Sequence, residues 1–369
     1  MATKDLLLLG FNDTKHMLLW GLGGGAAGGP TAPPFMFKRD TGIYVSKNPK
    51  VSADDTNTVK ISVSDFSYNQ VSNLELISKT AGLDRTGSRT VKPILTAVSP
   101  VSFSFTTYIR PILDTTVTSP EEYLWVGLMG YDNVISDSSS SLIDFSYGNV
   151  PELQELTIWL DREDHNEGNY RLDNAIIDSA EISFDINNIA QIIWYGRALG
   201  IVGDNNPPSY TDRTSQSECV KNKLTTVSLT MNTASYDLAL TGGNISIQNN
   251  NTFYGRTRLG QITLPEGHFS GDRVISGSLN FYMKEGTLSS ADFYNTILTY
   301  AKLTNYERDY LANVVLTIGG SGAPNIQVQL PQTLFEIGQQ RFDEVISIAI
   351  PFVVQEESAN YCTVTYQLT

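Results

Sequence analysis

The sequence predicts a mainly β protein with two tandem domains, each a β-sandwich or barrel with one flanking helix. The first observation is a strict alternation of apolar and polar residues, which is typical of strands with one buried face. The second is that helix signals are few, and the third is that each of them follows an alternating stretch. The clearest alternating stretches are Val101–Thr106, Glu181–Ile186, Asn244–Gln248 and Ser278–Tyr282.

Two segments carry the signals of a helix start. Ser119-Pro-Glu-Glu122 combines a capping residue, a first-turn proline and the glutamate of a capping box. Ser289-Ser-Ala-Asp292 opens a second helix in the same way, and Phe293, Ile297, Leu298 and Ala301 then fall on one helical face. Because strands and a helix recur in the same order in both halves, we predict a tandem duplication.

The joint between the two copies is predicted at residues 203–217, a polar stretch with the paired prolines Pro207 and Pro208 and no periodicity. This places an N-terminal domain at residues 1–202 and a C-terminal domain at residues 218–369.

The chain begins with a glycine-rich segment, about residues 1–35, that we interpret as a flexible or subunit-contacting arm. Gly23, Gly25 and Gly28 fit the spacing of a dinucleotide-binding fingerprint. Such a fingerprint must open a helix, and the prolines that follow at positions 30, 33 and 34 forbid one. We therefore expect no cofactor there.

The composition disfavours a protein that grips nucleic acid. The net charge is −14 and the pI is near 4.6, whereas phosphate binding needs clustered Lys and Arg. The same acidity is compatible with a surface that nucleic acid slides past, or with simple solubility. We expect neither a secretory signal nor a membrane segment. Cys219 and Cys362 are expected to be buried, reduced thiols, with a disulfide left open.

No catalytic or metal-binding constellation emerges. His16, His165 and His268 are far apart in the sequence, and the acidic stretch 161–167 lacks the spacing of a calcium loop. The acidic pairs Asp54-Asp55 and Glu121-Glu122 offer a glycosidase alternative. Glu122 is better explained as a helix cap and Asp54-Asp55 as a polar loop. We therefore predict that the chain is not an enzyme and holds no cofactor or metal.

Several stretches, in order, resemble the tail tube proteins of T-five-like siphophages. In the N-terminal half they are Phe103-Ser-Phe-Thr-Thr-Tyr-Ile-Arg-Pro111, Glu122-Tyr-Leu-Trp125, Ala180–Ile189 and Trp194-Tyr-Gly196. In the C-terminal half they are Lys221–Leu224, Ser235–Leu238, Thr241–Asn251 and Ser276–Leu279. The resemblance covers roughly residues 100 to 300.

This resemblance implies a structural virion protein of the duplicated, two-domain type. Three subunits would close a pseudo-hexameric ring, and stacked rings would form the tube through which genomic DNA is ejected into the host. The implied partners are other copies of the chain, the tape measure, tail terminator and tail tip proteins, and double-stranded DNA that passes without specific binding. The protein would be assembled in the host cytoplasm and reside in the virion tail. The immunoglobulin-like domain that follows the tube domains in the family is expected to be absent.

The alternating strands also suggest which residues line the channel. Their apolar members would pack inward, and their small polar and acidic neighbours would form the opposite face, which would let DNA pass because it lacks cations. The alternative is that this face meets bulk solvent. The residues predicted to face the lumen are Ser102, Ser104, Thr106, Glu181, Ser183, Asp185, Ser246, Gln248 and Asn280.

Two rival functions remain at this level. A carbohydrate-binding β-sandwich, such as an adhesin, would use exposed Trp20, Trp125, Trp159 or Trp194 as sugar-stacking platforms. The last three of these lie in apolar segments, where core packing is the favoured use. A β-rich hydrolase comes third.

Overall fold

The computed structural model describes residues 41–368, with internal gaps. The expected N-terminal arm, about residues 1–35, lies outside the described residues, as do His16, Trp20 and His165. The gaps are residues 50–51, 55, 79–90, 114–116, 132–133, 146–152, 163–167, 187, 205–207, 215–218, 255–266, 303–309, 321, 323 and 356–361.

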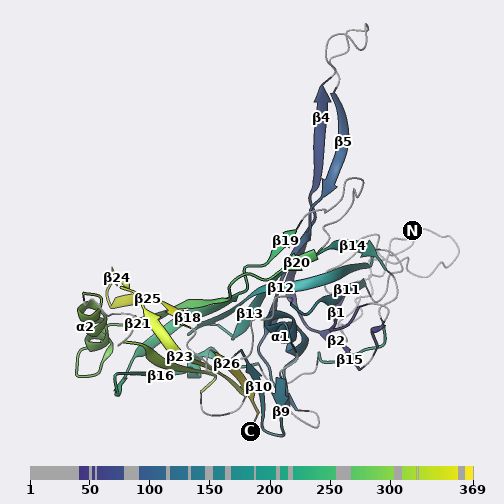
Figure 1. Ribbon diagram of the computed structural model, residues 1–369. Coiled ribbons are helices and arrows are strands. Elements are labelled where there is room, and N and C mark those ends of the chain that lie inside the picture. The colour runs from purple at the N-terminus through teal and green to yellow at the C-terminus, as the bar shows by residue number, and fades with distance from the viewer. Residues whose placement is uncertain are drawn as a thin grey trace, which may run out of the picture. The chain divides into compact units, whose positions relative to one another are not determined.

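The first half of the described chain forms two sheets that share one long strand, β12 (Figure 1). One sheet runs in the order β2, β1, β11, β12 and β14, and the other runs β3, β6, β13 and β12, with all neighbours antiparallel. A helix, α1, follows β6 in the chain. The bounds are β1 Thr41–Ser46, β2 Thr58–Ile61, β3 Ser64–Asn69, β6 Val101–Tyr108, α1 Glu122–Met129, β11 Leu156–Arg162, β12 Tyr170–Asp185, β13 Gln191–Ala198 and β14 Gly200–Gly203.

The second half repeats this pairing pattern strand for strand. One sheet runs β17, β16, β22, β23 and β26, and the other runs β18, β21 and β25, where β25 pairs with both β23 and β24. Helix α2 follows β21 as α1 follows β6. The bounds are β16 Thr226–Met231, β17 Ala234–Tyr236, β18 Ala239–Gln248, β21 Val274–Tyr282, α2 Ser290–Tyr300, β22 Ala312–Ile318, β23 Asn325–Phe335, β24 Gln339–Phe342, β25 Ile346–Val354 and β26 Thr363–Gln367.

Irregularities of the strands recur at matching places in the two halves. The β11–β12 pairing shifts between Leu156 and Ile158, and the β22–β23 pairing shifts between Ala312 and Val314. Each shift marks a β-bulge, where one strand gains an unpaired residue and bends. Matching bulges are what a duplicated module would produce. The predicted boundary at residues 203–217 stays a prediction.

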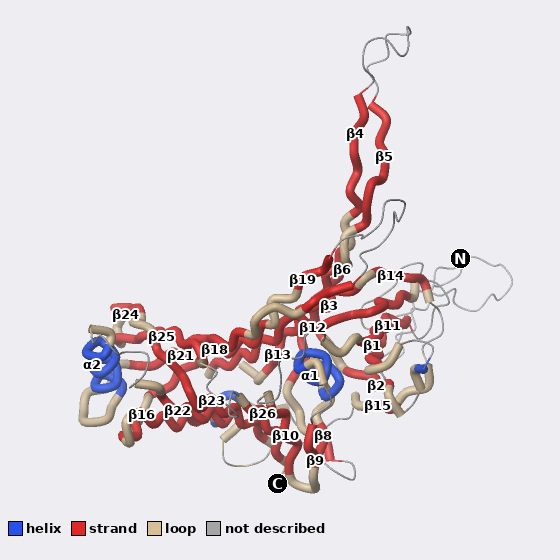
Figure 2. The backbone as a smooth tube through the Cα atoms, in the orientation of Figure 1, coloured by secondary structure: helices blue, strands red, loops and turns tan. Residues whose placement is uncertain are grey.

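The remaining strands are peripheral in the pairing scheme. β4 pairs with β5 and β19 with β20, and these hairpins are inserted at equivalent places, between β3 and β6 and between β18 and β21 (Figure 2). β9 pairs with β10, which pairs with β26 of the other half, and β15 pairs in parallel with β2. The bounds are β4 Ser72–Ser78, β5 Val91–Val98, β7 Ile112–Leu113, β8 Val117–Thr118, β9 Val134–Ser136, β10 Ser140–Asp144, β15 Thr211–Asp212, β19 Thr252–Tyr254 and β20 Gly267–Phe269.

The predicted core of the alternating strands is confirmed. The apolar members of these strands are buried, and each contributes about 1.5–3 kcal/mol relative to an exposed side chain. The mainly β fold with a helix in each half is thereby confirmed. The buried members are Phe103, Phe105, Ile182, Phe184, Ile245, Ile247, Leu279 and Phe281.

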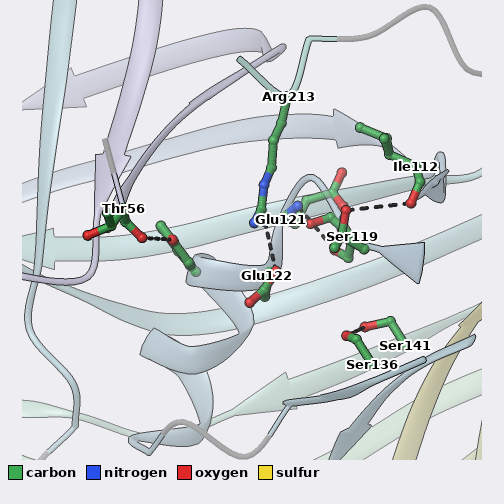
Figure 3. Close-up of polar contacts among 10 residues, drawn as sticks. Thr56, Ile112, Ser119, Glu121, Glu122, Ser136, Ser141 and Arg213 are labelled. Carbon is green, nitrogen blue, oxygen red and sulfur yellow. Dashed lines mark hydrogen bonds and ion pairs between the residues drawn. The ribbon is translucent and has the colours of Figure 1, made fainter. Parts of the chain in front are cut away.

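The start of α1 differs from the predicted capping box. The helix begins at Glu122 with Glu121 as its N-cap, and the Ser119 hydroxyl accepts a hydrogen bond from the Glu121 amide at 3.1 Å and donates one to the Glu121 carboxyl group at 3.0 Å (Figure 3). Glu122 instead lies 2.8 Å from the guanidinium group of Arg213. The prediction that Glu122 caps the helix was therefore wrong, because the N-cap is Glu121, two residues later than the Ser119 that the capping box requires.

Candidate channel face and assembly edges

Strands from both halves form one continuous antiparallel run in the order β3, β6, β13, β12, β18, β21, β25 and β24. The two halves meet within it where β12 pairs with β18, from Ser179 opposite Gln248 to Asp185 opposite Gly242. Figure 1 shows these central strands side by side. One face of the run covers the core, so its other face and its two ends are the features left for function.

The residues predicted to line the channel lie together on the face opposite the core. Glu181 is directly opposite Ser246, and Ser246 is directly opposite Ser276 on the next strand, so these side chains point to the same side. Eight of the nine predicted residues are exposed or half-buried. Thr106 is the exception, with 8% exposure, because the alternation of β6 breaks there.

The same face includes residues that sequence patterns missed. Asn244 bridges three strands, since its amide nitrogen donates to Glu181 Oε1 at 2.9 Å and its Oδ1 accepts from the Ser278 hydroxyl at 2.8 Å. The register of β24 also adds Gln339 and Arg341, which lie opposite Ala349 and Ser347 of β25. Arg341 is a cation on a face that the sequence predicted to have none. It went unnoticed because the segment Gln339-Gln-Arg-Phe342 shows no alternation.

A groove of about 550 Å³ lies where β12 ends and β24 runs beside β25. Its charged lining consists of Asp185, Asp343 and Glu344 against the single guanidinium group of Arg341. The acidic excess gives this end of the face a negative character. No cluster of three or more metal-ligating side chains occurs among the residues that the structure describes.

The two ends of the strand run are unpaired edges within the described part of the chain. β3 pairs only with β6, and β24 pairs only with β25. Both edges carry exposed apolar side chains, namely Tyr68 and Val71 at β3 and Ile337 and Phe342 at β24. Exposed edges of this kind recruit other strands, and natural monomers usually cover or charge them. These two edges are the candidate assembly edges.

The junction between the halves is fixed by more than strand pairing. Arg273 Nη2 donates to the carbonyl oxygens of Leu128 and Met129 at 3.1 and 3.0 Å, and Arg273 Nε donates to Asn249 Oδ1 at 2.8 Å. Asn249 in turn donates to the Leu128 carbonyl at 2.8 Å. A cation at the last carbonyls of a helix also interacts favourably with the helix dipole. The second half thus caps the helix of the first.

A buried polar cluster lies at the other end of α1. Glu121 is 1% exposed, and burial raises the pKa of its carboxyl group to about 7, although hydrogen bonds from Ser119 and Thr107 and the charge of Arg110 oppose that rise. Tyr366 of β26 is buried beside it and accepts a hydrogen bond from Trp125 Nε1 at 3.0 Å. The last strand of the chain is therefore tied to the helix of the first half.

Comparisons with known proteins decide between the interpretations of this arrangement. The chain is 28% identical over 305 residues to "Tail tube protein pb6" of Escherichia phage T5. The predicted relationship to the T5-like tail tube proteins is confirmed. It places the chain in the tail of a virion. The alignment covers 76% of this chain and 64% of pb6, so the chain spans less than two thirds of that relative.

Other comparisons add little. No protein-family model matches the chain. Among solved structures, a chain of the cryo-EM structure of the anti-feeding prophage baseplate is 14% identical with a TM-score of 0.25, over 36% of this chain and 89% of that chain. A score this low does not establish a shared fold, so the relationship rests on the sequence match to pb6.

The structure shows the burial of the tryptophan and cysteine side chains whose roles the sequence left undecided. Trp125, Trp159 and Trp194 are buried, as predicted, so they offer no platform for a sugar. Cys362 is buried and Cys219 half-buried, and both are free thiols. Burial raises the pKa of the Cys362 thiol to about 12. No helix in the described residues has the length and apolarity needed to cross a membrane.

Proposed function

We propose that this chain is the tube-forming subunit of a long-tailed phage, and that its copies close into rings through their β3 and β24 edges. The observation that carries the proposal is the internal β12–β18 junction. It joins one module to the next, and the edges left over at β3 and β24 are the equivalents of the two strands that it joins. A repeat that joins head to tail closes into a ring when a whole number of equal rotations completes the circle, and this proposal requires six.

In this proposal three copies supply six similar modules, and the rings stack into a tube. The domain division at residues 203–217 follows from the same reasoning. Tape measure, terminator and tip proteins are the partners expected at the ends of such a tube. The chain acts as a wall and a conduit, so no catalytic step is assigned to it.

The face opposite the core lines the lumen in this proposal. Duplex DNA carries about one negative charge per 1.7 Å of its axis, so a cationic wall would retain it. The face carries many hydroxyl and amide groups, and Glu181 and Asp185 add negative charge. Arg197, opposite Ser102, is a second cation on this face, and it forms an ion pair with Asp178 at 2.9 Å. Arg341 is flanked in the groove by Asp343 and Glu344. DNA would therefore meet a neutral to acidic wall.

Electron microscopy of the purified full-length chain over a range of concentrations tests ring formation. The proposal expects rings or tubes with threefold symmetry. Particles that stay monomeric at every concentration would reject it in favour of a monomeric binding protein.

Lysine substitutions test the lumen. Ser104→Lys and Gln248→Lys add cations to the proposed channel face, and Ser228→Lys adds one at an exposed position of β16, in the other sheet, as a matched control. Virions with the first two substitutions should assemble tails but release DNA more slowly than the control. Equal release rates in all three would remove the lumen assignment and leave ring formation untouched.

A further inference from the structure

We propose that β24 of one copy pairs antiparallel with β3 of a second copy in the register that β12 and β18 set within the chain. The inference rests on the proposed ring and names the residues that meet at its joint. It is carried by a residue-by-residue equivalence between the internal junction and the two free edges.

On one side of the joint, β24 is equivalent to the last part of β12. Glu181 and Ile182 of β12 pair with Ile193 and Ile192 of β13. Gln339 and Gln340 of β24 pair in the same way with Ala349 and Ile348 of β25. A bulge occurs at the matching position in β12 and in β23, so the same number of residues separates it from these pairs in both halves. Therefore the free edge of β24 corresponds to the edge of β12 that receives β18.

On the other side, β3 is equivalent to β18. In both halves an aromatic residue lies opposite a glycine, and this pair fixes the register. The aromatic residue is on β6 in the first half and on β25 in the second. Phe103 lies opposite Gly196, and Gly277 lies opposite Phe352. In each pair the aromatic ring lies over the glycine, where a Cβ would approach it to 2.3 Å at Gly196 and 2.7 Å at Gly277. Glycine is therefore required opposite the ring in both halves.

These pairs align β3 with β18 at single-residue precision. Tyr68 lies opposite Phe103, and Ile245 lies opposite Gly277, so Tyr68 corresponds to Ile245. The pairing of β3 shifts between Ser64 and Ser67, and that of β18 shifts between Leu240 and Gly242. Both edge strands therefore carry one extra residue, opposite Ser104–Thr106 in β3 and, one step further along, opposite Asn280–Phe281 in β18. The two bulges are neighbours under this alignment.

Side chains at the two free edges are more exposed than their equivalents at the internal junction. Phe184, beside β18, is 2% exposed, whereas its equivalent on β24, Phe342, is 76% exposed. Ile245 is fully buried, whereas its equivalent on β3, Tyr68, is 42% exposed. Tyr68 and Phe342 are thus apolar edge residues whose equivalents are covered at the internal junction. A second copy of this chain provides the cover with its own complementary edge.

The register follows directly. In the internal junction Ile182 lies opposite Ile245, which places Gln340 opposite Tyr68 of the second copy. A slip by one residue would pair side chains of the core face with side chains of the channel face, so the register is strongly specified. The expected pairs outside the β3 bulge are Ile337 with Val71, Gly338 with Gln70, Gln339 with Asn69, Gln340 with Tyr68, and Arg341 with Ser67.

Paired cysteines in the full-length chain test this register. In a Cys219→Ser background, Gln340→Cys with Tyr68→Cys should cross-link under mild oxidation, and Gln339→Cys with Asn69→Cys provides a second pair at the same register. Directly opposite residues of antiparallel strands have Cα atoms about 4.5–5.5 Å apart, which is within the span of a disulfide. We expect covalent dimers and trimers on non-reducing gels, with at least a fivefold excess over shifted pairs.

The shifted control joins Gln340→Cys with Phe66→Cys, two residues away on the same strand face. Rings seen by electron microscopy together with cross-links only in the shifted control would overturn the register and leave the proposed ring in place. Rings without cross-links in either matched pair would overturn it as well. Absence of both rings and cross-links, with the thermal unfolding of the background chain retained, would reject the ring itself.

Discussion

The buried carboxyl group of Glu121 should make the stability of this protein depend on pH. Its pKa in the folded chain is raised from the ordinary 4.5 to about 7 because burial disfavours the charged form. Below pH 4.5 the group is protonated in both the folded and the unfolded chain. As pH rises toward 7, the unfolded chain loses this proton first, so the free energy of unfolding falls. The loss is complete above pH 7 and amounts to about 3 kcal/mol.

Glu121→Gln should remove this loss, because a neutral amide keeps the size of the side chain and can accept a hydrogen bond from Ser119. At pH 8 the variant should be more stable than the natural chain by up to about 3 kcal/mol, and at pH 4 the difference should vanish. Urea denaturation of both chains across this range measures the difference. Glu285→Gln, at an exposed loop position, is the matched control.

A difference between Glu121→Gln and the natural chain that stays constant from pH 4 to pH 8 would refute this reasoning. So would an equal response of the Glu285→Gln control, because an exposed carboxyl group experiences no comparable desolvation.

Three further substitutions probe the packing. Arg273→Ala should lower the free energy of unfolding by about 2–3 kcal/mol, because the carbonyl oxygens of Leu128 and Met129 lose a charged donor; a denaturation midpoint equal to that of the natural chain would contradict it. Gly196→Ala should cost about 1–3 kcal/mol, since the new Cβ meets the ring of Phe103, and unchanged thermal unfolding would count against the aromatic–glycine pairing. Phe293→Ala should cost about 3–5 kcal/mol by calorimetry, because the ring is fully buried, and a loss under 1 kcal/mol would exclude this packing.

The fold was predictable where one face of a strand meets the core and the other does not. The alternation in Val101–Thr106 and Asn244–Gln248 identified both the buried side chains and the polar face. The start of the second helix was placed correctly, since Ser289 is its N-cap, and Phe293 and Ile297 of the predicted face are buried. Leu298 of that face is half-buried, and Ala301 is an exposed C-cap. In these segments local pattern and tertiary environment agree.

Other features could not be read from local patterns. β24 was missed because Gln339-Gln-Arg-Phe342 has no alternation. In the proposed ring its second neighbour belongs to another copy of the chain. β12 was predicted only in part, because its pairing with β13 shifts near Asp178 and the shift breaks the period of two. The contact of Arg273 with α1 joins residues far apart in the sequence, which no local signal encodes.

The most direct test of the account is a cryo-EM map of the assembled chain at a resolution that separates strands. The account predicts a closed circle of three subunits in which β24 of each copy runs antiparallel beside β3 of the next, with the polar face of β6, β12, β18 and β21 toward the axis. A ring closed through other strands, or one with the buried face of these strands toward the axis, would contradict it.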